Sequence, residues 1–138
     1  MAKRFNDVVD EANTGEKSAV RALQAWQVLI AAAHERRIVR YHDLREMMEY
    51  PDDRPLTSIL ACLMWYCEQH DLPPLTIIVV NQTGVPGGGF TAAQEADYHQ
   101  RREDVFNYVW YRLVPPTVAD LRAAFVKGYT QARDPLSD

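Results

Sequence analysis

The sequence predicts a single, mainly α-helical domain, residues 1–138, with one small β-hairpin. Apolar residues recur at steps of three and four over most of the chain, which is the period of one helix face. Only residues 75–80 are rich in β-branched side chains, so the expected β-structure is small. A composition of 47% hydrophobic and 25% charged residues is that of an average globular domain and excludes a disordered chain.

The first long helix is expected at residues 17–36, after a loose polar lead-in at residues 1–15. Its apolar residues recur at helical spacing and form one stripe along its length. They are Ala19, Leu23, Trp26, Ile30 and Ala33.

A short extended segment and a short helix come next. Residues 38–41, Ile-Val-Arg-Tyr, are expected to form an extended segment whose alternate side chains face opposite ways. Residues 43–50 are expected to form a helix that buries Leu44 and either Met47 or Met48.

The middle of the chain predicts a turn, a long helix and a strand. Residues 51–55 form the turn, because Pro55 disfavours helix at the residue before it and suits the first position of a new helix. The helix then covers residues 55–70 and is stopped by two prolines. Residues 75–80 are expected to be a strand that enters a hairpin turn at residues 81–84.

Two further helices complete the prediction. Thr91 and Gln94 form a capping-box pattern, in which both side chains satisfy free backbone donors at a helix start. Thr117 caps a last helix that closes at Gly128 and buries Val118, Leu121 and Phe125. The helix from Thr91 ends before Pro115 and points the following residues inward: Tyr98, Val105, Phe106, Val109, Trp110 and Leu113.

The charge of the chain excludes several classes of partner. A formal net charge of −4 rules out binding to DNA or to an anionic membrane by bulk charge, although a local patch remains compatible with it. Residues 35–54 hold five arginines against six acidic residues. The longest apolar run near the N-terminus, residues 28–33, is too short to span a bilayer, so no membrane contact is expected. Cys62 and Cys67, without a secretion signal, favour reduced thiols in a cytoplasmic protein.

Five short segments follow one another in the order of a winged helix-turn-helix. They are AWQVL (25–29), RIVRYHDL (37–44), PDDR (51–54), LPP (72–74), and VVN with the glycines after it (79–89). Residues 22–90 thereby resemble the C-terminal domain of O6-alkylguanine-DNA alkyltransferases and the non-enzymatic alkyltransferase-like proteins. The resemblance implies an alkyltransferase-like winged helix-turn-helix at residues 17–90 and a C-terminal helical extension at residues 91–130.

The reactive motif of that family is absent here. Its Pro-Cys-His-Arg segment, which carries the alkyl acceptor, aligns with residues 75–78, Leu-Thr-Ile-Ile. No thiol stands at the acceptor position, and no histidine or arginine stands beside it to activate one. We therefore expect no alkyl transfer, no enzyme activity and no cofactor.

Two residues match positions with family roles. Tyr41 matches the tyrosine that presses on the DNA backbone during base flipping, and Arg54 approximates the arginine that fills the vacated base stack. The alternative for Tyr41 is a strand-end residue that packs over the helix-turn-helix. The alternative for Arg54 is a turn residue paired with Asp52 or Asp53.

The helix at residues 55–70 separates two faces on a helical wheel. The face opposite the core holds small residues and Trp65. We expect Trp65 to be exposed and to anchor a partner. The alternative is that Trp65 is covered by the N-terminal segment or by the helix near Trp110. The core face consists of Leu56, Ile59, Leu60, Leu63, Tyr66 and Cys67. The opposite face consists of Thr57, Ser58, Ala61, Met64, Trp65 and Glu68.

Together these features predict a non-catalytic nucleic-acid-binding protein whose affinity for DNA is weakened by its net acidity. The alternative is a protein–protein interaction module or small regulator that uses the same face for a protein partner or for self-association. No metal site is expected, because the four histidines lack ligand spacing. The residues expected to contact nucleic acid or a partner are Tyr41, Arg54, Thr57, Ser58, Ala61, Trp65, Gln82, Gly84, Gly87 and Gly88.

Overall fold

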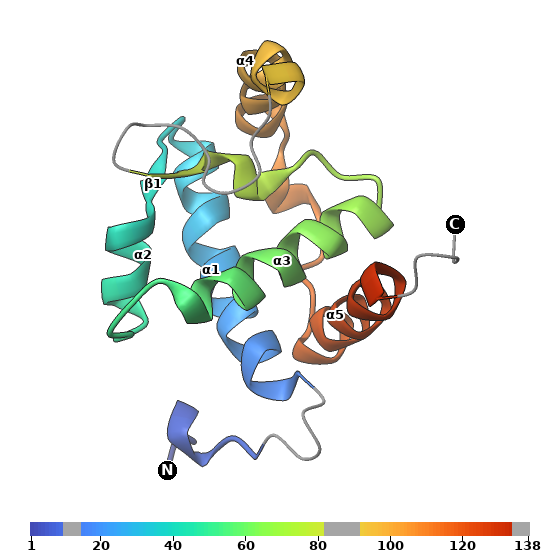
Figure 1. Ribbon diagram of the computed structural model, residues 1–138. Coiled ribbons are helices and arrows are strands. Elements are labelled where there is room, and N and C mark those ends of the chain that lie inside the picture. Colours follow the sequence, from blue (N-terminus) through green and yellow to red (C-terminus); the bar gives the residue numbers. More distant parts are fainter. Residues whose placement is uncertain (10–14, 82–91, 134–138) are drawn as a thin grey trace.

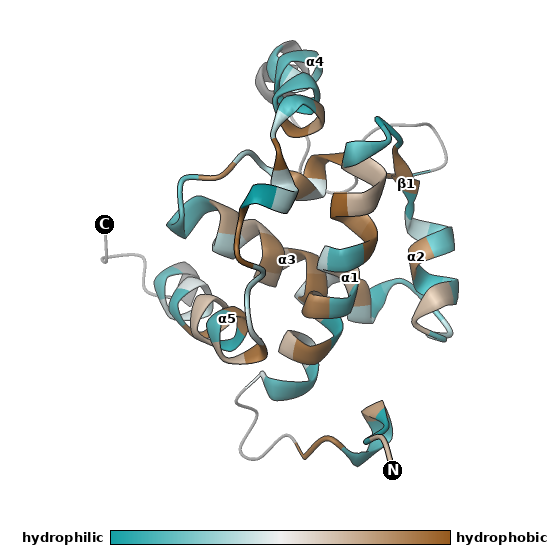
Figure 2. Ribbon diagram, turned by 180° about the vertical axis from the view of Figure 1, so that it is seen from behind, coloured by the Kyte–Doolittle hydropathy of each residue, from teal (hydrophilic) through white to brown (hydrophobic). Residues whose placement is uncertain are grey.

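The computed structural model describes residues 1–9, 15–81 and 92–133 (Figure 1). This part of the chain is mainly helical and contains one two-stranded parallel sheet. Apolar residues of α1 and α3 gather at the centre of the molecule, whereas α4 is largely hydrophilic (Figure 2). Among the described residues, no helix is long and apolar enough to cross a membrane.

Helix α1, Glu16–His34, is the centre of the core and confirms the first predicted helix. It packs against both α3 and α5. Several of its buried positions are alanines, whose small side chains allow a neighbouring helix to approach closely. In the predicted stripe Leu23 is half-buried, and four residues are buried: Ala19, Trp26, Ile30 and Ala33.

Strand β1, Val39–Arg40, leads directly into α2, Tyr41–Met47. Helix α2 begins two residues before the predicted start, so Tyr41 is its first residue and not the end of a strand. The buried methionine is Met48, while Met47 is 57% exposed. Glu49 ends this helix with φ 58°, a left-handed conformation that glycine adopts more readily.

Helix α3, Arg54–Gln69, confirms the second long predicted helix to within one residue at each end. The proline after Arg54 occupies the first turn, where a missing backbone N–H costs nothing. All six residues predicted for its core face are buried, and the list extends to Cys62 on the same helix.

The predicted strand at residues 75–80 is wrong over its first four residues. Leu75–Ile78 forms a 3₁₀ helix, and only β2, Val79–Val80, is extended. β2 pairs in parallel with the two residues of β1. The backbone N–H of Ile77 does not join the sheet and donates to the carbonyl of Pro74 at 3.0 Å. The predicted hairpin turn lies almost wholly outside the described residues.

Helix α4, Ala92–Asn107, ends earlier than the sequence predicts. The chain then turns through a 3₁₀ helix, Trp110–Arg112, and the indole Nε1 of Trp110 donates to the carbonyl of Val105 at 2.8 Å. The turn buries Trp110 against the core but leaves Val109 48% exposed, so the prediction that Val109 points inward is wrong. The predicted cap at Thr91 lies outside the described residues.

Helix α5, Val118–Arg133, begins as predicted but does not end at Gly128. Thr117 and Asp120 cap it reciprocally, with Asp120 N–H donating to Thr117 Oγ1 at 3.1 Å and Thr117 N–H to the Asp120 carboxylate at 2.9 Å. Gly128 lies inside the helix, and a Cβ atom at this position would overlap the ring of Trp65. The glycine is therefore explained by a close approach of α5 to α3, and not by a helix end.

Candidate functional site

One stripe of α3 is left largely uncovered in the fold. It runs along the helix at steps of three and four, and we call it the open stripe. Ala61 is its half-buried member, and Met64 is 38% exposed. The open stripe consists of Arg54, Thr57, Ala61, Met64 and Glu68.

The neighbouring stripe of α3 lies against α5. The Cys62 thiol donates to the carbonyl of Leu121 at 3.2 Å, and the Gln69 amide donates to the carbonyl of Ala124 at 3.1 Å. Ser58 continues this stripe toward the start of α3 and is half-buried. The open stripe is thus the uncovered side of α3, because α5 occupies the adjacent side.

Trp65 belongs to this covered side, so the expectation of an exposed anchor is wrong. Its ring is half-buried, lies over Gly128, and makes an edge contact with Phe125 at 5.8 Å between ring centroids. The alternative prediction, that another part of the chain covers Trp65, is confirmed, but the covering element is α5 and neither the N-terminal segment nor the helix near Trp110. The indole stabilises the contact between two helices of the same chain.

Tyr41 lies at the start of α2, half-buried and packed against the hydrophobic core. Its aromatic body therefore has a packing role in the domain. The residue before it, Arg40, is exposed and has no carboxylate partner among residues 1–9, 15–81 and 97–131. In the sequence analysis Arg40 was one of the five arginines of residues 35–54 and was given no role of its own.

Arg54 is paired as the predicted alternative describes. Its Nε and one terminal nitrogen contact the two carboxylate oxygens of Asp52 at 3.1 and 2.8 Å, and its backbone N–H donates to the same group at 2.9 Å. These hydrogen bonds lower the pKa of Asp52 from 3.8 to about 2. The Arg54 side chain is nevertheless 91% exposed, so the pair is open to competition from solvent and from other anions.

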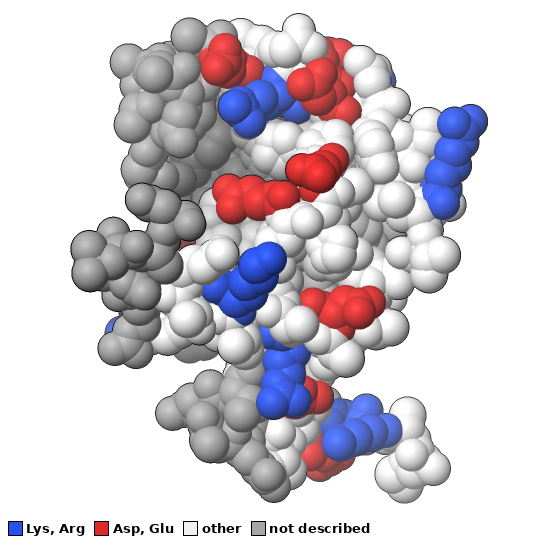
Figure 3. All heavy atoms as spheres, turned by 90° about the vertical axis from the view of Figure 1, so that its right-hand side faces the viewer, with Lys and Arg blue, Asp and Glu red and all other residues white. Residues whose placement is uncertain are grey.

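Three more arginines of residues 35–54 have carboxylate partners. Their closest nitrogen–oxygen distances are 2.6 Å for Arg36–Glu103, 2.6 Å for Arg37–Glu35 and 3.6 Å for Arg45–Asp53. These pairs mix the two signs of charge in this region and do not separate them into a basic surface. On the side of the molecule that faces away from α2, shown in Figure 3, acidic and basic side chains are interspersed as well.

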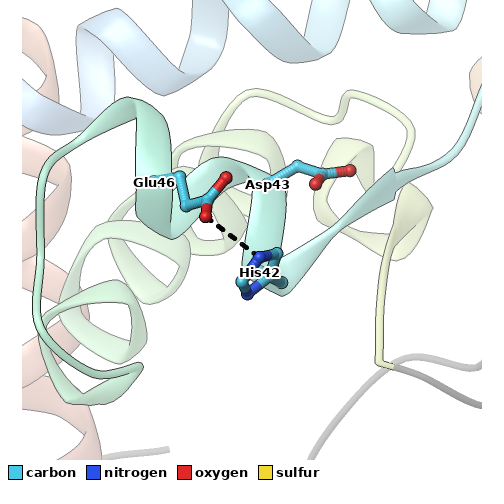
Figure 4. A group of neighbouring side chains, drawn as sticks. All are labelled: His42, Asp43 and Glu46. Atoms are coloured by element: carbon cyan, nitrogen blue, oxygen red, sulfur yellow. Dashed lines mark ion pairs between the residues drawn. The ribbon is translucent and has the colours of Figure 1, made fainter.

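Three exposed side chains at the start of α2 have the residue types of a metal site: His42, Asp43 and Glu46 (Figure 4). His42 Nε2 lies 3.1 Å from the Glu46 carboxylate, and its Nδ1 lies 2.8 Å from the guanidinium of Arg45. Both ring nitrogens thus have protein partners, and a cationic group stands beside the cluster. Hydrogen bonds between neighbouring side chains on the helix surface account for this arrangement.

The two cysteines are free, as the sequence predicts, and both are buried, although the helical wheel placed only Cys67 on the core face. Burial raises the pKa of Cys62 to about 12 and that of Cys67 to about 11, so both remain protonated at neutral pH. A protonated thiol is a poor nucleophile and a poor metal ligand. These residues pack the core and supply no reactive group.

The predicted wing residues Gln82, Gly84, Gly87 and Gly88 lie outside the described residues. Of the other predicted contact residues, the fold places Arg54, Thr57 and Ala61 on one uncovered stripe. Comparisons of the chain with known protein families, with curated proteins and with solved structures give no match.

Proposed function

We propose that this chain is a non-catalytic nucleic-acid-binding protein of alkyltransferase-like winged helix-turn-helix architecture. In this proposal α2 and α3 are the helix-turn-helix, β2 leads into the wing, and the open stripe of α3 faces the nucleic acid. The observation that carries the proposal is the open stripe itself. A long helix that follows a short helix and a turn leaves one side free, while its other sides are packed against the domain.

The chemistry of the open stripe suits close approach to a groove. Thr57 and Ala61 have small side chains, so the helix backbone can come near the edges of the bases. Arg54 lies at the positive end of the helix, where an anion is favoured. Arg40, at the end of β1, supplies a second cation.

The charge balance sets the strength of such binding. Arg40 and Arg54 together provide two phosphate contacts, for which the logarithm of the binding constant falls with the logarithm of salt concentration with a slope of about −2. Raising salt from about 50 mM to about 200 mM then weakens binding about tenfold. The protein is expected to bind duplex DNA weakly and with a shallow salt dependence.

Fluorescence anisotropy with a labelled DNA duplex at low salt tests the proposal. Arg54→Ala should weaken binding and reduce the salt slope by about 1. Asp52→Asn should strengthen it, since the amide keeps the shape of the carboxylate but releases the Arg54 guanidinium. Arg112→Ala, an exposed arginine outside α2 and α3, is the matched control and should change little. No binding at micromolar protein in low salt would eliminate the proposal.

The pairing of four arginines with carboxylates favours a second candidate, a protein–protein interaction module or small regulator that uses the same face. Met64 would then be the apolar contact of the open stripe, since Trp65 is covered by α5. Light scattering or a pulldown should detect a complex or a self-associated form that Met64→Glu disrupts. A strictly monomeric protein without a captured partner speaks against this candidate.

A further inference from the structure

We infer that the N-terminal segment, residues 1–9, is a strap that closes over Arg21 and thereby holds the turn between α2 and α3. This inference does not depend on what the open stripe binds. The sequence predicts a loose lead-in here, but Phe5 is half-buried, and the centre of the Arg21 guanidinium lies 3.8 Å from its ring centroid. This is the closest cation–aromatic contact among the described residues.

Arg21 connects three parts of the chain. It projects from α1, stacks near Phe5 of the N-terminal segment, and donates to the carbonyl of Met48 at 3.2 Å. Its other terminal nitrogen donates to the Gln24 side chain at 3.0 Å, and the Tyr50 ring centroid lies 5.4 Å from the guanidinium. Its described acceptors are thus neutral, and aromatic rings supply the remaining stabilisation of the charge.

The strap presents Phe5 from a short ordered turn. Phe5–Asp7 forms a 3₁₀ turn in which the backbone N–H of Arg4 donates to the Asp7 carboxylate at 3.1 Å and that of Val8 donates to the carbonyl of Phe5 at 3.0 Å. These bonds order the backbone that carries Phe5 while its ring lies against Arg21.

The contact reaches the turn that sets the start of α3. Met48 is the C-cap residue that follows α2, and the next residue, Glu49, adopts a positive φ of 58°. When Phe5 covers the guanidinium, water is excluded from one side of the bond between Arg21 and the Met48 carbonyl, and that bond is strengthened. Opening of the strap therefore loosens this turn, while the α1–α3–α5 core stays closed.

Amide hydrogen exchange tests the coupling directly in the Phe5→Ala variant, which keeps Arg21. The Glu49 and Tyr50 amides, bonded to carbonyls of α2 at 3.0 and 3.2 Å, should exchange about 5- to 30-fold faster, the range that a partly desolvated cation–aromatic contact supports. The Leu121 amide, bonded to the carbonyl of Thr117 at 3.1 Å beside a fully buried side chain, is the control for the helical core and should keep its rate. Unchanged exchange at Glu49 and Tyr50 would overturn the inference, and so would equal acceleration at Leu121.

Limited trypsin digestion provides a second test, in which the rate of cleavage after Arg4 is compared between variants that all keep Arg4. Arg21→Met removes the guanidinium but leaves the bond after Arg4 as it is, so cleavage there should be about 5- to 30-fold faster if Arg21 holds the strap. Lys17→Met is the matched control one helical turn away, since the Lys17 ammonium lies 5.8 Å from the Phe5 ring and should contribute much less. Equal cleavage rates in Arg21→Met and the wild type would exclude a closed strap.

Discussion

Gly128→Ala isolates the contact between α5 and α3, and we expect it to destabilise the protein. A Cβ atom at this position overlaps three atoms of the Trp65 indole, close to the point where the ring joins its own backbone. The ring cannot swing away as the end of a flexible side chain would. Either the indole must change rotamer or α5 must move away from α3.

The magnitude follows from two opposing effects. Overpacking of a formed contact costs about 1–3 kcal/mol, and the severity of this overlap places it near the upper value. Alanine in place of glycine inside a helix stabilises the folded state by about 1 kcal/mol. The net loss in the free energy of unfolding is therefore about 2 kcal/mol, which corresponds to a fall in Tm of roughly 6–10 °C for a domain of this size.

Urea denaturation followed by circular dichroism measures the loss, and a double-mutant cycle assigns it to the indole. In a Trp65→Leu background the overlap is relieved, so Gly128→Ala should become neutral or stabilising by up to about 1 kcal/mol. Ala123→Gly, at an exposed position of the same helix, measures the helix-propensity contribution alone. An equal effect of Gly128→Ala in both backgrounds would refute the reasoning, as would stabilisation of the otherwise wild-type chain.

Three further predictions follow from other local features. Glu49→Gly should raise the urea midpoint by an amount equivalent to about 0.5–1 kcal/mol, because glycine relieves the left-handed backbone at φ 58°, and a lowered midpoint would contradict this. Cys62 and Cys67 should resist alkylation in the native protein at pH 8 and react after unfolding, since burial raises the pKa of both thiols; rapid native labelling would show that they are accessible. Asp52 should titrate near pH 2 by carboxyl NMR and return toward 3.8 in Arg54→Ala, so the stabilisation from this pair is present above about pH 4 and is lost as pH falls toward 2. A wild-type midpoint at 3.8 would mean that the Arg54 pair does not persist in solution.

Local signals in the sequence predicted α1 and α3 closely. In both helices apolar residues repeat at the helical period, and prolines mark the boundaries of α3, so burial of one face and the helix ends follow from neighbouring residues alone. The cap at Thr117 was predictable for the same reason, because its partner Asp120 lies in the same turn. Thr57 and Ala61 of the open stripe follow from the helical wheel, whereas Arg54 was singled out by the family resemblance.

Long-range contacts decided the rest. A glycine at position 128 predicts a helix end, yet it is explained by the close contact with Trp65, which lies far away in the sequence. Trp65 in turn is on the exposed face of the α3 wheel, but α5 packs beside it in the fold. Of residues 75–80 only Val79 and Val80 are extended, and they pair with two residues of β1 from a distant part of the chain. Sequence by itself thus determined the positions and the apolar faces of α1 and α3. Only the tertiary structure decided which of the remaining faces is covered, because coverage depends on surfaces that meet in space and leave no periodic signal along the chain.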